Sequence, residues 1–96
     1  MKIKQSEKRA LKAAGHNLKP IITIGTNGLS ESLLSEFEKT IDHHELIKIR
    51  IRISDKSSRK ELIEKLCDKS KSQVVSTIGN TAVVFRKNPK SQKKFF

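Results

Sequence analysis

Leu46-Ile47-Lys48-Ile49-Arg50-Ile51-Arg52-Ile53 is the stretch that decides the fold, because apolar and basic residues alternate from Ile47 to its end. Successive side chains of a β-strand point to opposite faces. The pattern therefore predicts a strand with isoleucines on one face and Lys48, Arg50 and Arg52 on the other. A slip by one residue would bury these cations, so we expect a fixed register. The pattern also predicts a sheet with one covered face and, along this strand, one face open to water.

Amphipathic patterns lie on both sides of this strand in the chain. Apolar residues at helical spacing predict one helix over about residues 30–42 and another over about residues 58–69. Ser58 and Glu61 have the spacing of a capping box, although Asp55 could instead cap a slightly longer helix. We therefore expect helices in the connections on both sides of the strand.

The N-terminal part predicts a further helix and a short strand. We expect the helix to run from Ser6 to Ala14, with Gly15 as its C-terminal stop. Leu11 and Ala14 would give this helix a narrow apolar side. The apolar run over residues 21–24 then predicts the first strand.

The C-terminal part predicts a β-hairpin, which completes the fold. Gly79-Asn80 separates two short runs rich in β-branched residues, residues 73–78 and residues 81–86. The helical connections favour parallel pairing of the first strand with the second and of the second with the third, and the hairpin makes the fourth strand antiparallel. We therefore expect one α/β domain in the order α-β-α-β-α-β-β. Its four-stranded mixed sheet would carry helices mainly on one face.

Length and composition limit the organisation of the chain. Its 96 residues predict a single domain over residues 1–88 and a basic tail over residues 89–96 that is mobile in isolation. No run approaches the ~20 apolar residues of a membrane span, and the N-terminus lacks the apolar stretch of a signal peptide. We therefore expect a cytoplasmic protein. Cys67 is the only cysteine, so no internal disulfide can form.

The net charge of +11 points to a polyanionic partner. Nucleic acid is the first candidate, and an anionic membrane surface is the second. The helix over residues 6–14 has too small an apolar side to insert into a membrane, so we expect no membrane attachment.

Gly25-Thr26-Asn27-Gly28 joins the first predicted strand to the following helix. A glycine has no Cβ, so another backbone can approach closely, and the helix start directs N–H groups and partial positive charge toward a phosphate. The residues after Gly28 exclude a P-loop, and the lack of a third glycine excludes a dinucleotide fingerprint. Two interpretations remain, a tight connection between elements and a phosphate site for nucleic acid.

The basic side chains also allow two interpretations, a solvated surface and a ligand site. Lys48, Arg50 and Arg52 could form a solvated face, but cations without an interleaved acid repel one another, which favours an anionic ligand. Lys8 and Lys12 of the first helix are weaker candidates that would add long-range attraction. The chain has no Trp and no Tyr, so we expect contacts with phosphates, sugars and the shape of a structured RNA.

No catalytic group or metal site is expected. His43-His44-Glu45 places two histidines at a helix end, where they suit the helix dipole, and His16 is distant in the chain. Cys67 falls on an apolar stripe and is expected to be a small buried side chain. We therefore predict no enzyme activity, no cofactor, no metal and no small-molecule substrate.

Three motifs, in order and at similar spacing, resemble the bacterial single-domain YhbY-like proteins. They are Leu18-Lys19-Pro20, Ile24-Gly25-Thr26-Asn27-Gly28-Leu29-Ser30 and His43-His44-Glu45-Leu46-Ile47-Lys48. These proteins are stand-alone members of the CRM domain family, named for chloroplast RNA splicing and ribosome maturation. The resemblance covers nearly the whole chain.

The resemblance implies a fold similar to the C-terminal domain of bacterial initiation factor 3. It also implies RNA binding with association to precursors of the large ribosomal subunit. Carried over by position, the family's proposed RNA contacts are the loop Gly25–Gly28, Lys19 and Lys48. Arg50 and Arg52 are added from the alternation alone.

We therefore expect a monomeric, non-enzymatic protein that contacts structured ribosomal RNA and assists assembly of the large subunit. A general DNA- or RNA-binding protein without a ribosomal role is the alternative. A small enzyme or an accessory protein that docks on an acidic protein partner also remains open.

Overall fold

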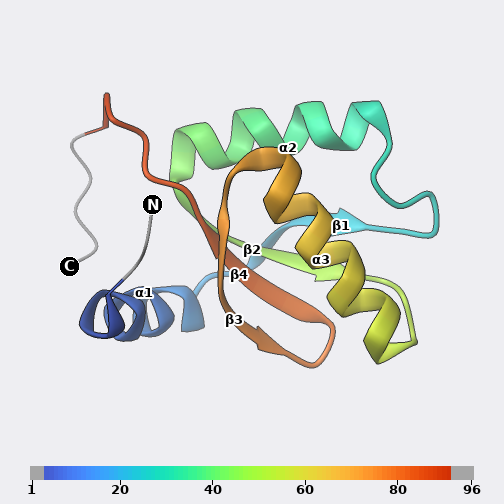
Figure 1. Ribbon diagram of the computed structural model, residues 1–96, viewed down its shortest axis with the longest axis horizontal. Coiled ribbons are helices and arrows are strands. Elements are labelled where there is room, and N and C mark those ends of the chain that lie inside the picture. Colours follow the sequence, from blue (N-terminus) through green and yellow to red (C-terminus); the bar gives the residue numbers. More distant parts are fainter. Residues whose placement is uncertain (1–3, 92–96) are drawn as a thin grey trace.

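The computed structural model describes residues 4–91, in which three helices pack on a four-stranded sheet (Figure 1). The elements in chain order are α1 (Gln5–His16), β1 (Pro20–Ile24), α2 (Glu31–His44), β2 (Leu46–Ile51), α3 (Lys56–Ser70), β3 (Gln73–Ile78) and β4 (Thr81–Phe85). This order and the α/β class agree with the prediction. Most of the predicted tail, including Lys93 and Lys94, lies outside the described residues.

The sheet has the strand order β1-β2-β4-β3. β1 runs parallel to β2, whereas β4 is antiparallel to both β2 and β3, so the predicted mixed sheet and hairpin are confirmed. The predicted direct pairing of β2 with β3 is wrong, because β4 lies between them. The burial pattern explains this position. Residues 82–85 of β4 are all buried, as a central strand requires, whereas the end of β3 is exposed and suits an edge.

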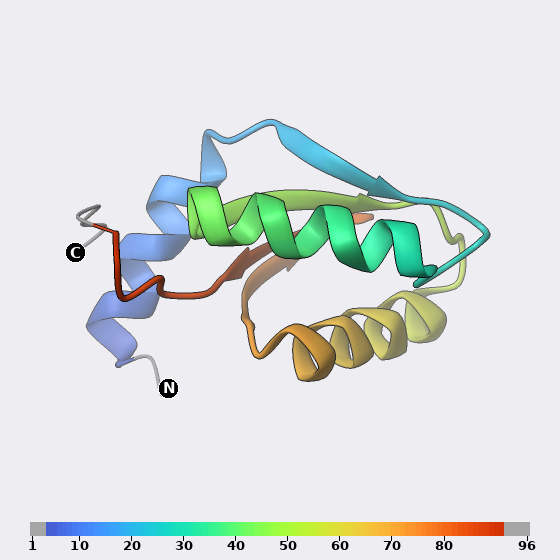
Figure 2. The same ribbon diagram turned by 90° about the horizontal axis from the view of Figure 1, so that it is seen from above.

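The main core lies between the sheet and the two helices α2 and α3. Ile47, Ile49 and Ile51 of β2 are buried there, as the alternation predicted. Phe37 of α2 and Leu66 of α3 pack in the same cluster. Figure 2 shows α2 running alongside the strands, with α1 crossing near one end of the sheet.

α1 forms a smaller core on the opposite face of the sheet. Leu11 is buried against side chains from β2, β3 and β4, including Val83. The helix continues through Gly15, so the predicted stop at this glycine is wrong. A Cβ on Gly15 would lie 2.6 Å from Val83 Cγ1, so the glycine allows the helix to approach β4. Ala14, predicted on the apolar side, is exposed.

The ends of β2 and α3 differ slightly from the prediction. β2 ends at Ile51 rather than Ile53, and α3 begins at Lys56. Asp55 caps α3 because its carboxylate accepts a hydrogen bond from Ser58 N at 2.9 Å, so the alternative cap is the one observed. The basic face of β2 is half-buried rather than fully open, since α1 covers one end of that face.

Candidate nucleic-acid interface

Gly25, Thr26, Asn27 and Gly28 form a tight turn between β1 and α2, which we call the glycine turn. Gly28 N donates to Gly25 O at 3.1 Å and closes the turn. Gly28 has a φ of 64°, a left-handed conformation that favours glycine. Gly25 is not in this region, and a Cβ added to it would meet nothing within 4 Å. Neither backbone conformation nor internal packing therefore requires a glycine at position 25.

The start of α2 lies directly beside the glycine turn. Ser30 caps this helix by accepting a hydrogen bond from Leu33 N at 3.2 Å. The two elements line a shallow hollow to which Ser32 and Glu36 also contribute. The hollow offers backbone amides and hydroxyl groups but has no lysine or arginine in its lining. An anion bound there would need positive charge from a neighbouring element.

Lys48, Arg50 and Arg52 lie on or directly after β2, the strand next to β1, and we call them the cation row. Arg52 N donates to Ile24 O at 2.8 Å, so Arg52 lies at the end of β1 beside the glycine turn. Alternate residues of a strand are about 7 Å apart, so the row extends over roughly 13 Å. It leads from the glycine turn toward α1.

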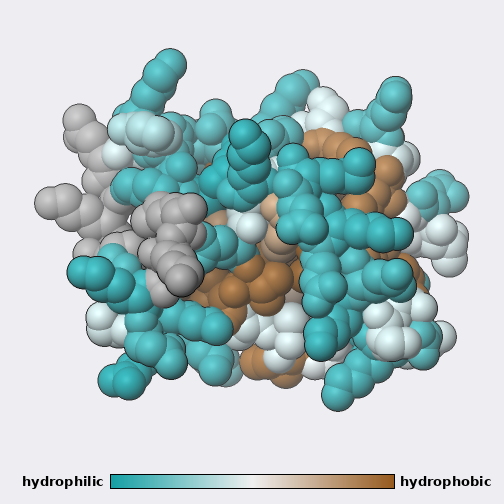
Figure 3. Space-filling view, in the orientation of Figure 1, coloured by the Kyte–Doolittle hydropathy of each residue, from teal (hydrophilic) through white to brown (hydrophobic). Residues whose placement is uncertain are grey.

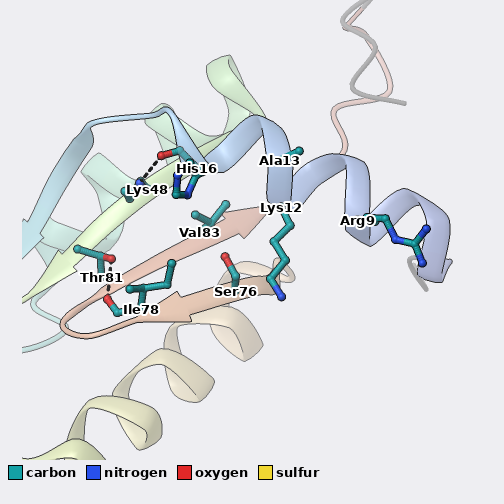
Figure 4. A pocket seen from close by; sticks show the side chains of 9 residues that line it. All are labelled: Arg9, Lys12, Ala13, His16, Lys48, Ser76, Ile78, Thr81 and Val83. Atoms are coloured by element: carbon teal, nitrogen blue, oxygen red, sulfur yellow. Dashed lines mark hydrogen bonds between the residues drawn. The ribbon is translucent and has the colours of Figure 1, made fainter.

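The other end of the cation row opens into a hollow between α1 and the sheet, which we call the α1 hollow (Figure 4). It has a volume of about 340 Å³. Its basic side chains are Arg9, Lys12, His16 and Lys48. Lys48 Nζ donates to His16 O at 3.2 Å and so ties β2 to the end of α1.

The structure brings some of the predicted residues together and separates others. Lys12 and Lys48 meet in the α1 hollow. Lys19 is exposed and directly precedes Pro20, whose partner in the β1–β2 ladder is Lys48, so it lies near the same end of the row. Lys8 is exposed on α1 and does not line the hollow.

Sequence reasoning did not assign Arg9 and His16 to a site. With Lys12 and Ala13 they recur at helical spacing along α1. The helical period of the sequence could therefore have indicated that these four residues lie along one side of the helix. Ser76 and Thr81 reach the hollow from β3 and β4. No local pattern indicates these two residues, because their position depends on the strand order.

Charge is distributed unevenly over the described part of the molecule. Within α1, Glu7 is the only carboxylate, beside Lys8, Arg9 and Lys12. α2, on the other face of the sheet, carries four carboxylates: Glu31, Glu36, Glu38 and Asp42. Arg86 forms ion pairs with two of them, Glu38 and Asp42. α1 and the cation row are therefore net positive, whereas α2 is net negative.

Hydrophilic side chains dominate the face seen in Figure 3, and apolar atoms show in patches between the helices. Two large apolar side chains are exposed in the described residues, Ile21 at 52% and Ile78 at 66%. They belong to the edge strands β1 and β3, and Ile78 lines the α1 hollow. The basic surface therefore includes apolar contact area.

His43 and His44 end α2, and Glu45 follows them. The rings of His43 and His44 meet edge to face, with centroids 4.8 Å apart. Glu45 is fully buried and accepts a hydrogen bond from Asn88 N at 2.8 Å, so it anchors the chain after β4. Among residues 4–91, His, Cys, Asp and Glu side chains form no cluster of three that could hold a metal.

Two further observations concern the rest of the described chain. Cys67 is buried, as expected, and this burial raises the pKa of its thiol. None of the helices within residues 4–91 has the length and apolar character needed to cross a bilayer.

Comparison with known proteins gives consistent matches. The model of the CRS1/YhbY (CRM) domain matches residues 3–86. A "probable RNA-binding protein" of Pseudomonas aeruginosa is 41% identical over 93 residues, which cover 97% of this chain and 89% of that protein. An "RNA-binding protein" of Haemophilus influenzae is 36% identical over 80 residues, with 83% and 81% covered.

A solved structure matches the fold as well. The solution structure of a Staphylococcus aureus protein, described as a candidate RNA-binding protein, superposes with a TM-score of 0.84. The two chains are 32% identical, and the match covers 96% of this chain and 95% of the other.

Proposed function

Because the chain belongs to the CRS1/YhbY (CRM) domain family, we propose that it is an RNA-binding protein without catalytic activity. Its ligand is structured ribosomal RNA, and it assists assembly of the large ribosomal subunit as a monomer in the cytoplasm. The ribosomal part of the proposal follows from the resemblance of its three motifs to YhbY-like proteins.

The observation that carries the proposal is the open turn at Gly25. Nothing in the fold requires a glycine there, whereas an approaching backbone does benefit from the missing Cβ. The cation row begins beside this turn at Arg52. A turn that leaves room for a backbone, next to a line of cations, suits a sugar–phosphate chain.

Binding in this arrangement depends on phosphates. Amide groups of the glycine turn and of the start of α2 donate to phosphate oxygens, as helix N-termini commonly do. Arg52, Arg50 and Lys48 neutralise phosphates further along, and the cations of α1 attract the RNA from a distance. Such contacts position a folded RNA rather than read its bases.

Replacing Gly25 by Ala tests the glycine turn. The variant should fold with unchanged circular dichroism and equal or slightly higher stability, because Ala restricts the unfolded chain. Its affinity for a paired ribosomal RNA fragment should fall about tenfold, the equivalent of one lost hydrogen bond. An unchanged affinity in the folded variant would leave the turn as a mere connection.

A second pair of variants controls for the added methyl group. Gly28 and Gly79 both have positive φ values, and a Cβ would meet open space at either position. Gly28→Ala and Gly79→Ala should each destabilise the fold by about 1 kcal/mol through left-handed strain. Only Gly28→Ala should weaken binding to paired RNA, because Gly79 lies in the β3–β4 hairpin.

The ribosomal role needs a test in cells. We expect the protein to co-sediment with particles of the large subunit, and ribonuclease treatment should release it. Retention after ribonuclease would indicate docking on a protein partner instead.

A general nucleic-acid-binding protein is the second candidate, because the net charge of +11 alone attracts any polyanion. Competition at physiological salt separates the two candidates. A fragment of ribosomal RNA should displace bound RNA better than duplex DNA of equal length does.

A further inference from the structure

The α1 hollow combines three kinds of chemistry in a small space. Its volume of about 340 Å³ is at the lower end of the range for small-ligand pockets. Cationic side chains of α1 and β2 form one wall, and the hydroxyl groups of Ser76 and Thr81 lie opposite (Figure 4). Val83 and Ile78 add apolar surface.

The polar groups of the hollow are already oriented. Lys48 Nζ donates to His16 O at 3.2 Å, which uses one of its three donors and leaves two. Thr81 Oγ1 donates to Ile78 O at 2.9 Å, so its lone pairs can still accept a hydrogen bond. The hollow therefore offers donors for an anion and acceptors for an exocyclic amine or a sugar hydroxyl.

The apolar groups suit a flat ring. Ile78 is 66% exposed although it is a large apolar side chain, so the core does not account for its position. The imidazole of His16 is a group on which an unpaired RNA base can stack. A base, a ribose and a phosphate together match the apolar, hydroxyl and cationic parts.

We propose that the α1 hollow holds one unpaired nucleotide that protrudes from the bound RNA. The inference rests on the proposed function, since Lys48 belongs both to the hollow and to the cation row that leads from the glycine turn. The RNA backbone follows the row, and the protruding nucleotide enters the hollow at its far end. The protein thereby distinguishes an RNA with a bulged nucleotide from a continuous duplex.

Two RNA hairpins of equal length test the inference, one fully paired and one with a single bulged nucleotide. Wild-type protein should bind the bulged hairpin about tenfold more tightly, as expected for one stacked base. Ser76 of β3 lines the hollow, whereas its neighbour Thr77 does not. Ser76→Leu places apolar bulk in the hollow without changing any charge, and Thr77→Leu is its matched control.

Ser76→Leu should lose the tenfold preference and keep its affinity for the paired hairpin, whereas Thr77→Leu should keep both. In NMR titrations, the amides of Ser76 and Thr81 should shift with the bulged hairpin alone. Equal binding of the two hairpins by wild type, or a preference that survives Ser76→Leu, overturns the inference but leaves the proposed function standing. Failure to bind either hairpin overturns both. Displacement of the bulged hairpin from the hollow by an acidic peptide would also overturn the inference, since it would assign the hollow to a protein partner.

Discussion

At the scale of the residue, the glycine turn contains two glycines with different reasons to be glycine. Gly28 adopts a φ of 64°, which other residues rarely tolerate. Gly25 has no such conformation and no neighbour within 4 Å of an added Cβ. The sequence motif makes the two positions look equivalent. Only the three-dimensional structure distinguishes the glycine that the fold needs from the one available to a ligand.

A prediction at the residue scale concerns Asp55, through which the stability of the fold depends on pH. Hydrogen bonds from the Ser58 and Ser57 side chains and from Ser58 N lower the pKa of Asp55 from its usual value of 3.8. A lowered pKa means that the carboxylate stabilises the fold above pH 3.8 and loses this effect as the pH falls through the folded-state pKa.

The variant Asp55→Asn can still cap α3 but does not titrate. Wild type should unfold at a higher urea concentration than Asp55→Asn at pH 7, and the difference should shrink as the pH falls below 3.8. Urea titrations of both proteins over this range measure it. A difference that stays constant at all pH values would show that the charge of Asp55 adds nothing to the cap.

At the scale of the element, α1 depends on its close approach to β4. Gly15→Ala raises helix propensity by about 1 kcal/mol, but its Cβ would lie 2.6 Å from Val83 Cγ1. We expect the overlap to dominate, with a net loss of roughly 1–3 kcal/mol in the free energy of unfolding. Urea denaturation measures this loss.

The double variant Gly15→Ala with Val83→Ala tests whether overlap with Val83 causes this loss of stability. Val83→Ala alone leaves a cavity, but together with Gly15→Ala it makes room for the new methyl group. The double variant should therefore lose less stability than the sum of the single variants. Strict additivity would mean that Gly15 and Val83 are not coupled in the way the structure implies.

The elements also show how far the sequence predicts this fold. The alternation in β2 and the helical period of α2 were correct because burial on one face leaves a periodic trace. Gly15 was misinterpreted because a glycine that ends a helix and one that packs against a strand look alike in sequence. The position of β4 was missed because long-range pairing depends on burial on both faces, which hairpin signals do not reveal.

At the scale of the whole molecule, charge governs the proposed binding. Log affinity for RNA should fall with log salt concentration, with a slope of roughly −0.7 to −0.9 per phosphate neutralised. Changing Arg50 to Gln should reduce the slope by about one such unit. Lys65→Gln, an exposed position on α3, should leave the slope unchanged. An affinity independent of salt would contradict the proposed role of the cation row.

Only part of the candidate site could be predicted from the sequence, because the rest depends on how the whole molecule packs. The alternation in β2 and the resemblance to known motifs indicated the cation row and the glycine turn. The α1 hollow takes residues from α1, β2, β3 and β4, and its shape exists only after these elements pack. Both Lys12 and Arg9 line this hollow, but only Lys12 was predicted as an RNA contact.

The separation of carboxylates on α2 from cations on α1 and β2 contributes to a permanent electric dipole of the folded chain. In the field of a polyanion such a dipole experiences a torque, which rotates the protein while it is still diffusing. Its basic side would then already face the polyanion at first collision. The orientational search that slows most macromolecular encounters would be shortened before any contact is made.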